Sequence, residues 1–114
     1  MAHQEPSPGI EALWRDHCAA RFPSGVAGDE IAGVCVASLD TFAAGCIQSF
    51  LASAGSLDAE RLAVLVSCSR DLATVVPEMN GEAKHCFARL EKLTTMVLDA
   101  VDRGTRPGRT SRST

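Results

Sequence analysis

Residues Ile31 to Leu57 read IAGVCVASLDTFAAGCIQSFLASAGSL, with one formally charged side chain, Asp40, and no proline. Apolar residues recur there at steps of three and four, the spacing of one face of an α-helix. A helix with so few charged residues is usually covered over most of its circumference. We therefore predict a central helix over residues 29–54. Its predicted buried stripe is Ile31, Cys35, Leu39, Phe42, Ala43, Cys46 and Phe50, with Val36 and Ile47 at the edge.

This stretch is also long enough to cross a membrane, because about 20 apolar residues span a bilayer. Asp40 and Gln48 would be costly at the centre of a lipid layer. The flanking residues are acidic, with no basic residue near either end to set an orientation. We therefore predict a helix buried in a soluble protein.

The composition of the whole chain favours closely packed helices in a single domain. The 114 residues include four Phe, one Trp and no Tyr, so the core must be aliphatic and rich in alanine. Similar periodicity predicts three further helices, with short connections that make neighbours antiparallel. Gly55 is the expected C-cap of the central helix, and Ser56 is the expected N-cap of the next one. The further helices are predicted over residues 8–20, 57–76 and 81–103.

The fold class that follows is all-α, an antiparallel up-down four-helix bundle over residues 8–103 with a shorter first helix. Residues 1–7 are predicted to be a disordered N-terminus, and residues 104–114 a disordered tail rich in Arg, Ser and Thr. In the helix over 81–103, the predicted core seam is Ala83, Phe87, Leu90, Thr94, Val97 and Val101. Its predicted outer residues are Glu82, Lys84, His85, Arg89, Lys92 and Asp99.

Charge and cysteine use limit the classes of partner and compartment. Residues 1–102 hold all 14 acidic residues but only seven basic ones, for a net charge of −7. The last 12 residues hold four Arg and no acid. Because nucleic acid is also negatively charged, an acidic body argues against a nucleic-acid partner and favours a basic protein partner. The five cysteines lie inside helical patterns and no secretory signal pattern opens the chain, which predicts a reducing cytoplasm.

Asp40 is the residue to which a chemical role is most easily assigned. A carboxylate among apolar residues in mid-helix is expensive to bury without a partner. It would act either as a general base or ligand anchor near Trp14 and His17, or as a structural group. In the structural interpretation, which we favour, it pairs with Arg21, Arg61 or the Trp14 N–H.

The cysteines and histidines do not form a recognisable metal or catalytic motif. Cys35 and Cys46 are eleven residues apart, about 16 Å along a helix, too far for one metal ion or a disulfide. His17-Cys18 and His85-Cys86 are adjacent pairs, whose side chains diverge by about 100° on a helix. No glycine-rich phosphate loop occurs. We therefore predict no metal and no cofactor.

The predicted function is that of a non-enzymatic interaction protein. A short first helix cannot cover all the apolar surface of the second and third helices, and surplus apolar surface marks a protein partner or a homo-oligomer. One alternative is a small-molecule or cofactor binder with a cavity near Asp40, using Trp14 and His17. Another is a thiol-dependent or metal-dependent activity. The predicted interface residues are Gly33, Ala37, Ala44, Val64, Cys68 and Val75.

Overall fold

Four helices packed against one another make up most of the chain, which confirms the predicted all-helical fold. The computed structural model describes residues 8–20 and 30–104. The predictions for residues 1–7 and 105–114 lie outside the described residues. The helices are α1 (Pro8–Ala19), α2 (Val36–Ala52), α3 (Ala59–Val75) and α4 (Gly81–Gly104). The short elements are β1 (Glu30–Ile31), β2 (Val34–Cys35) and the 3-10 turn η2 (Val76–Glu78).

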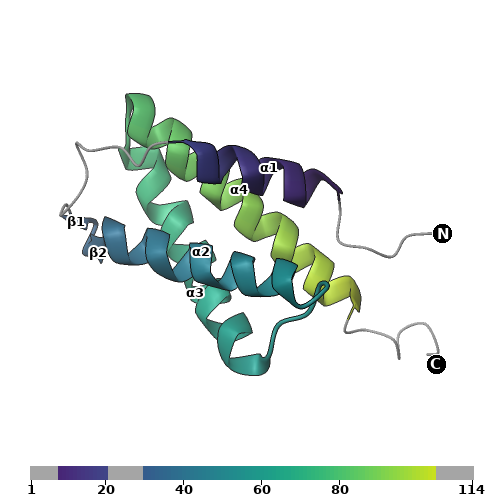
Figure 1. Cartoon of the computed structure of the whole chain (residues 1–114). Helices are drawn as coiled ribbons and strands as arrows, with labels where there is room; N and C mark the ends of the chain where they lie inside the picture. The colour runs from purple at the N-terminus through teal and green to yellow at the C-terminus, as the bar shows by residue number, and fades with distance from the viewer. Residues whose placement is uncertain (1–7, 21–29, 105–114) are drawn as a thin grey trace.

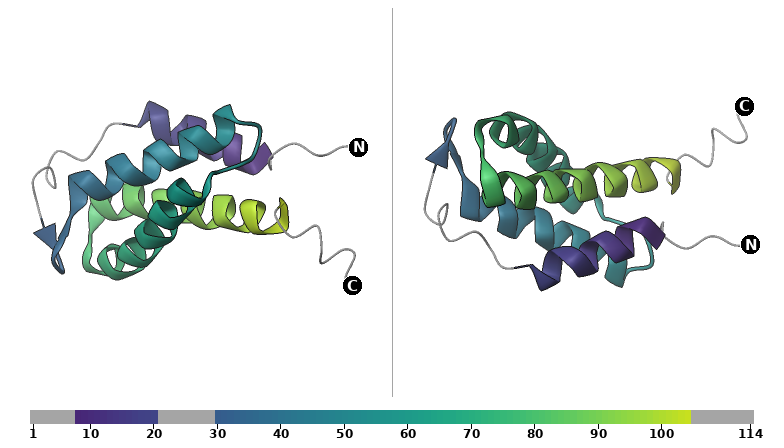
Figure 2. Two further views of the ribbon diagram at one scale, coloured as in Figure 1. Left: turned by 90° about the horizontal axis from the view of Figure 1, so that it is seen from below. Right: turned by 90° about the horizontal axis from the view of Figure 1, so that it is seen from above.

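The longest helix, α4, packs against each of the other three helices, and α2 also packs against α3 (Figure 1). Helix α3 is steeply inclined to α2, and α1 and α3 lie on opposite sides of the molecule (Figure 2). This arrangement leaves α1 and α3 to cover different parts of α2. In the described ranges, no helix combines the length and the hydrophobicity needed to cross a lipid bilayer.

The core is aliphatic, as the composition predicts, but it is not rich in alanine. Among the described residues, its buried side chains include Ala43 as the one alanine, together with Phe50 and Phe87. The predicted seam of α4 is confirmed, since its residues from Phe87 to Val101 are at most 3% exposed and Ala83 is half-buried. The short helix α1 joins this core through Ile10, which is completely buried. The largest completely buried side chains are Phe50, Phe87, Ile10, Ile47, Leu65, Leu72, Leu90 and Leu93.

The central helix begins later than predicted, because residues 30–35 form a two-stranded antiparallel hairpin. Ile31 pairs with Val34, and the two residues between them, Ala32 and Gly33, have φ angles of 53° and 81°. Positive φ at both positions of a two-residue loop gives the twist that a tight hairpin needs. The β-branched side chains of Ile31 and Val34 also favour extended backbone. The prediction of helix over 30–35 was therefore wrong, and residue 29 lies outside the described residues.

The late start of α2 also changes which residues it buries. Val36 and Ile47, predicted at the edge of the stripe, are completely buried, whereas Phe42, predicted at its centre, is 57% exposed. The predicted stripe was located partly from Ile31 and Cys35, which belong to the hairpin and not to the helix. When the stripe is located from the helical residues alone, the buried face of α2 no longer includes Phe42.

The connection between α2 and α3 ends one helix and caps the next. Ala54 and Gly55 have φ angles of 58° and 98°, and the Gly55 N–H donates to the Phe50 carbonyl at 2.9 Å. The N-cap of α3 is Asp58 rather than the predicted Ser56, because its carboxylate accepts the Arg61 N–H at 2.8 Å. This hydrogen bond lowers the pKa of Asp58. Arg61 also pairs with Asp58 through its guanidinium group.

Candidate functional site

Three helices meet at the side chain of His17. The Arg89 Nε–H on α4 donates a hydrogen bond of 3.2 Å to His17 Nδ1. On the other edge of the ring, His17 Nε2 lies 3.6 Å from Oδ1 of Asp40 on α2. The ring of Trp14, one helical turn earlier on α1, stacks on the imidazole with 6.0 Å between centroids and 30° between planes. We call these four residues the His17 cluster.

The imidazole of His17 lies between two charged groups. Arg89 donates to Nδ1 on one edge, and the Asp40 carboxylate faces Nε2 on the other. The geometry therefore places a guanidinium and a carboxylate on opposite edges of one ring.

A cavity of about 210 Å³ opens beside this cluster. All three residues predicted as ligand-binding, Trp14, His17 and Asp40, line it, although they come from two helices. The His17 side chain is 9% exposed and the Asp40 side chain is 25% exposed, so both are largely removed from water. The other lining residues are Cys18, Ala20, Ala44 and Cys86.

The structure brings Asp40 to a residue that was not among its expected partners. It faces His17, whereas Arg61 pairs with Asp58 and Arg21 lies outside the described residues. Arg89 was predicted on the outer face of α4 and was missed as part of the site. A long side chain at the edge of a buried stripe can reach inward, and its helical position alone does not reveal this.

The same geometry gives no support to the thiol-dependent or metal-dependent alternative. Arg89 and Asp40 engage both nitrogens of His17, so neither is directed at a cysteine. Burial raises the pKa of the Cys86 thiol in the cavity wall, with opposing effects from Arg89, and burial raises the pKa of Cys68 to about 11. In the part of the chain that the structure describes, no three His, Cys, Asp or Glu residues could hold a metal ion together.

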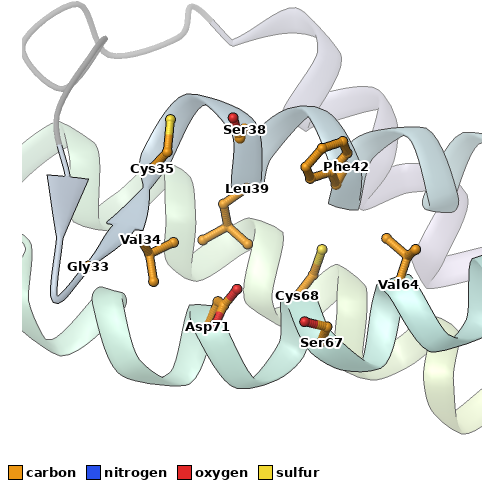
Figure 3. A pocket seen from close by; sticks show the side chains of 10 residues that line it. All are labelled: Gly33, Val34, Cys35, Ser38, Leu39, Phe42, Val64, Ser67, Cys68 and Asp71. Carbon is orange, nitrogen blue, oxygen red and sulfur yellow. The ribbon is translucent and has the colours of Figure 1, made fainter.

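A larger hollow of about 520 Å³ lies between α2 and α3 and is shown in Figure 3. We call it the α2–α3 groove. Phe42 and Val64 stand on its rim, and Leu39 and Cys68 contribute to its wall. Asp71 is the one charged residue in the lining. The residues that define the groove are Gly33, Val34, Cys35, Ser38, Leu39, Phe42, Val64, Ser67, Cys68 and Asp71.

Two exposed apolar side chains, Phe42 and Val64, line this groove, whereas Val66 does not. The large hydrophobic residues that are exposed in the described ranges are Phe42, Val64 and Val66, at 57%, 38% and 36%. Phe42 and Val64 also line a second hollow of about 410 Å³ that continues along α2 toward Arg61. These two side chains therefore form a ridge between two depressions.

The six predicted interface residues are divided by the structure. Gly33, Val64 and Cys68 line the α2–α3 groove. Ala37 is half-buried and Ala44 lines the cavity beside His17. Val75 is completely buried, so it presents no surface to a partner. Val75 is the last residue of α3, where this side of the helix packs into the core.

Cys35 is a feature of the groove that the prediction did not single out. It is the N-cap residue of α2 and it is exposed. Hydrogen bonds from the Ser38 side chain and backbone lower the pKa of its thiol. Its neighbour across the hairpin, Glu30, has the opposite effect.

The described part of the chain therefore presents two places where another molecule could bind, the cavity beside His17 and the α2–α3 groove. Helices α1, α2 and α4 contribute to the cavity beside His17, whereas the groove lies between α2 and α3. Their geometry is the basis for a functional assignment, since no protein-family model, no curated protein and no solved structure matches this chain.

Proposed function

We propose that this protein self-associates as a homodimer through the α2–α3 face, and that it functions as an interaction protein. The observation that carries the proposal is the pair of exposed apolar side chains, Phe42 and Val64, that line both the groove and the hollow next to it. Exposed large apolar side chains that are contiguous in this way mark interaction surfaces. Burying a phenylalanine side chain contributes about 1.5–3 kcal/mol, so two copies of Phe42 supply a substantial part of an interface.

The distribution of charge favours a second copy as the occupant. The whole chain carries a net charge of −3, so two copies repel each other except where charge is sparse. Helix α2 contains one charged residue, Asp40, and that carboxylate faces His17 on α1 rather than the groove. The groove itself contains only the Asp71 carboxylate. Two copies meeting here would bring few like charges together.

The shape of the face also favours a two-fold arrangement. In a symmetric dimer the same patch meets itself, so each protrusion needs a depression at the symmetry-related place. The ridge of Phe42 and Val64 stands directly beside the groove of about 520 Å³. A two-fold axis between ridge and groove would place the ridge of each copy in the groove of the other.

The experiment is light scattering behind a sizing column, over a dilution series. Wild-type protein should have the mass of a dimer at high concentration, and Phe42→Asp should have the mass of a monomer. Phe42 is more than half exposed, so the variant should still fold, which circular dichroism checks. Ala88→Asp, at an exposed position on α4, is the matched control and should remain dimeric.

A wild-type monomer at every concentration would overturn the homodimer and leave the face for a different protein. A Phe42→Asp variant with an unchanged dimer mass would place the interface elsewhere.

A further inference from the structure

The carboxylate of Asp40 is partly removed from water, since its side chain is 25% exposed. Among the described residues its polar neighbour is the His17 Nε2, at 3.6 Å, beyond ordinary hydrogen-bond length. The Arg89 guanidinium lies on the opposite edge of the imidazole. A carboxylate that loses water is costly unless a positive group contacts it.

The remaining walls of the cavity suit a cation that is weakly hydrated. Trp14 contributes an aromatic ring, and Ala44 and Ala20 contribute small apolar surfaces. Indole rings attract ammonium groups through their negative faces, and this attraction increases when water is excluded. An inorganic cation would need several more ligands, and the described residues provide no group of three.

From these features we infer that the cavity beside His17 binds a small organic cation with an alkylammonium group. The ammonium group lies against the Asp40 carboxylate and the Trp14 ring. The cavity volume of about 210 Å³ corresponds to roughly seven water molecules. That is smaller than the 300–1,000 Å³, approximately, of pockets for drug-sized ligands, so the ligand has only a few non-hydrogen atoms.

Trp14 provides a direct readout, because it is the one tryptophan of the chain. Its fluorescence should change in a saturable way when choline is added. The matched probe is 3,3-dimethyl-1-butanol, in which a neutral carbon replaces the charged nitrogen of choline. We expect it to bind at least about tenfold more weakly, a difference of about 1.4 kcal/mol. Sodium chloride at the same ionic strength controls for a general effect of salt.

Variants of the protein distinguish the effect of the carboxylate charge on binding from the effect of the cavity shape. Asp40→Asn keeps the size of the side chain and removes its charge, so it should weaken choline binding at least about tenfold. Asp99→Asn, which removes a carboxylate from an exposed position on α4, is the matched control and should bind like the wild type. Thermal melts followed by circular dichroism show whether each variant is folded.

Equal responses to choline and to its neutral analogue would overturn the proposal. So would the lack of a saturable response up to about 100 mM choline, or unchanged choline binding by folded Asp40→Asn. If Asp40→Asn fails to fold, Ala44→Leu provides the decision, because it fills the cavity and leaves the carboxylate in place. Loss of choline binding in that variant supports the site, and retained binding contradicts it.

Discussion

At the scale of single residues, polar groups in this protein are buried with few partners. His17 is oriented by Arg89 on one edge and Asp40 on the other. Thr94 is completely buried, and its hydroxyl has no hydrogen-bond partner in the described part of the chain. A buried hydroxyl without a partner costs about 1–3 kcal/mol in lost hydration. Stability can therefore be gained at such a position.

Replacing Thr94 with Val should raise the free energy of unfolding by about 1 kcal/mol, because a methyl group replaces the unsatisfied hydroxyl. Urea denaturation of both proteins measures the change. Thr95→Val, at the exposed position next to it, should change stability by less than about 0.5 kcal/mol. A destabilised Thr94→Val variant would show that the hydroxyl has a partner in solution.

The Cys68 thiol predicts a loss of stability at alkaline pH. Burial raises its pKa from 9.0 to about 11 in the folded protein, with smaller contributions from Cys46 and Asp71. The folded state therefore holds this proton more tightly than the unfolded chain. The resulting stability is fully present below about pH 9.0 and is lost as the pH rises to about 11.

Urea denaturation across this range, for wild type and Cys68→Ala, measures the effect. The wild type should lose more stability between these pH values than the variant does. Parallel pH profiles for the two proteins would contradict the assignment to Cys68.

At the scale of elements, backbone conformation at the helix ends explains what periodicity could not predict. The apolar pattern from Ile31 onward fits a helix, but positive φ at Ala32 and Gly33 commits residues 30–35 to a hairpin. At the other end, α2 stops at Ala52, and the chain turns through Ala54 with a φ of 58°. An alanine costs about 1–2 kcal/mol in this left-handed region, where glycine is tolerated.

Ala54→Gly should therefore raise the free energy of unfolding by about 0.5–1 kcal/mol, the strain relieved less the extra entropy of the unfolded chain. Ala52→Gly should lower it by about 0.5–1 kcal/mol, since Ala52 is still helical. Thermal or urea denaturation compares the two variants. The same substitution two residues apart should thus have opposite signs, and equal signs would contradict the turn described here.

At the scale of the whole molecule, α1 is attached to the core by a small number of buried contacts. Ile10 is completely buried, and Leu13 and Trp14 are half-buried against the core. Most contacts of α1 are made with α4. With so few buried contacts, α1 is the helix whose unfolding shows whether all four helices unfold together.

Ile10→Ala should lower the free energy of unfolding by about 2–4 kcal/mol, because it leaves a cavity between α1 and the other helices. Leu13→Ala, at a half-buried position, should cost less. Trp14 fluorescence reports on α1 and circular dichroism on all helices, so coincident urea transitions indicate a single cooperative unit. Separate transitions in the wild type would show that α1 unfolds on its own.

The sequence predicted the fold class and the core of α4 because long periodic segments determine both. Phe87, Leu90 and Val97 repeat along an uninterrupted helix, and all three are completely buried. The direction of Phe42 was not predictable, since it depends on where α2 begins and on how α3 crosses it. Periodicity describes one helix at a time and carries no information about inclination between helices.

The same limit applies to the candidate sites. Asp40 was singled out because a lone charge in an apolar stretch needs a partner, and Trp14 and His17 were named with it. The contribution of Arg89 could not be predicted, since 72 residues separate it from His17. Only the packing of α1 on α4 brings the two side chains together.

This separation has a consequence for how the protein is made. Because chains are synthesised from the N-terminus, α1 leaves the ribosome first, yet the helix that carries Arg89 emerges last. At about 5–20 residues per second, the interval between His17 and Arg89 is roughly 4–14 s. During this time Ile10 and Trp14 have no docking surface on α4, whereas α2 and α3 can already pair. We therefore expect the nascent chain to pair α2 with α3 first and to dock α1 onto α4 last.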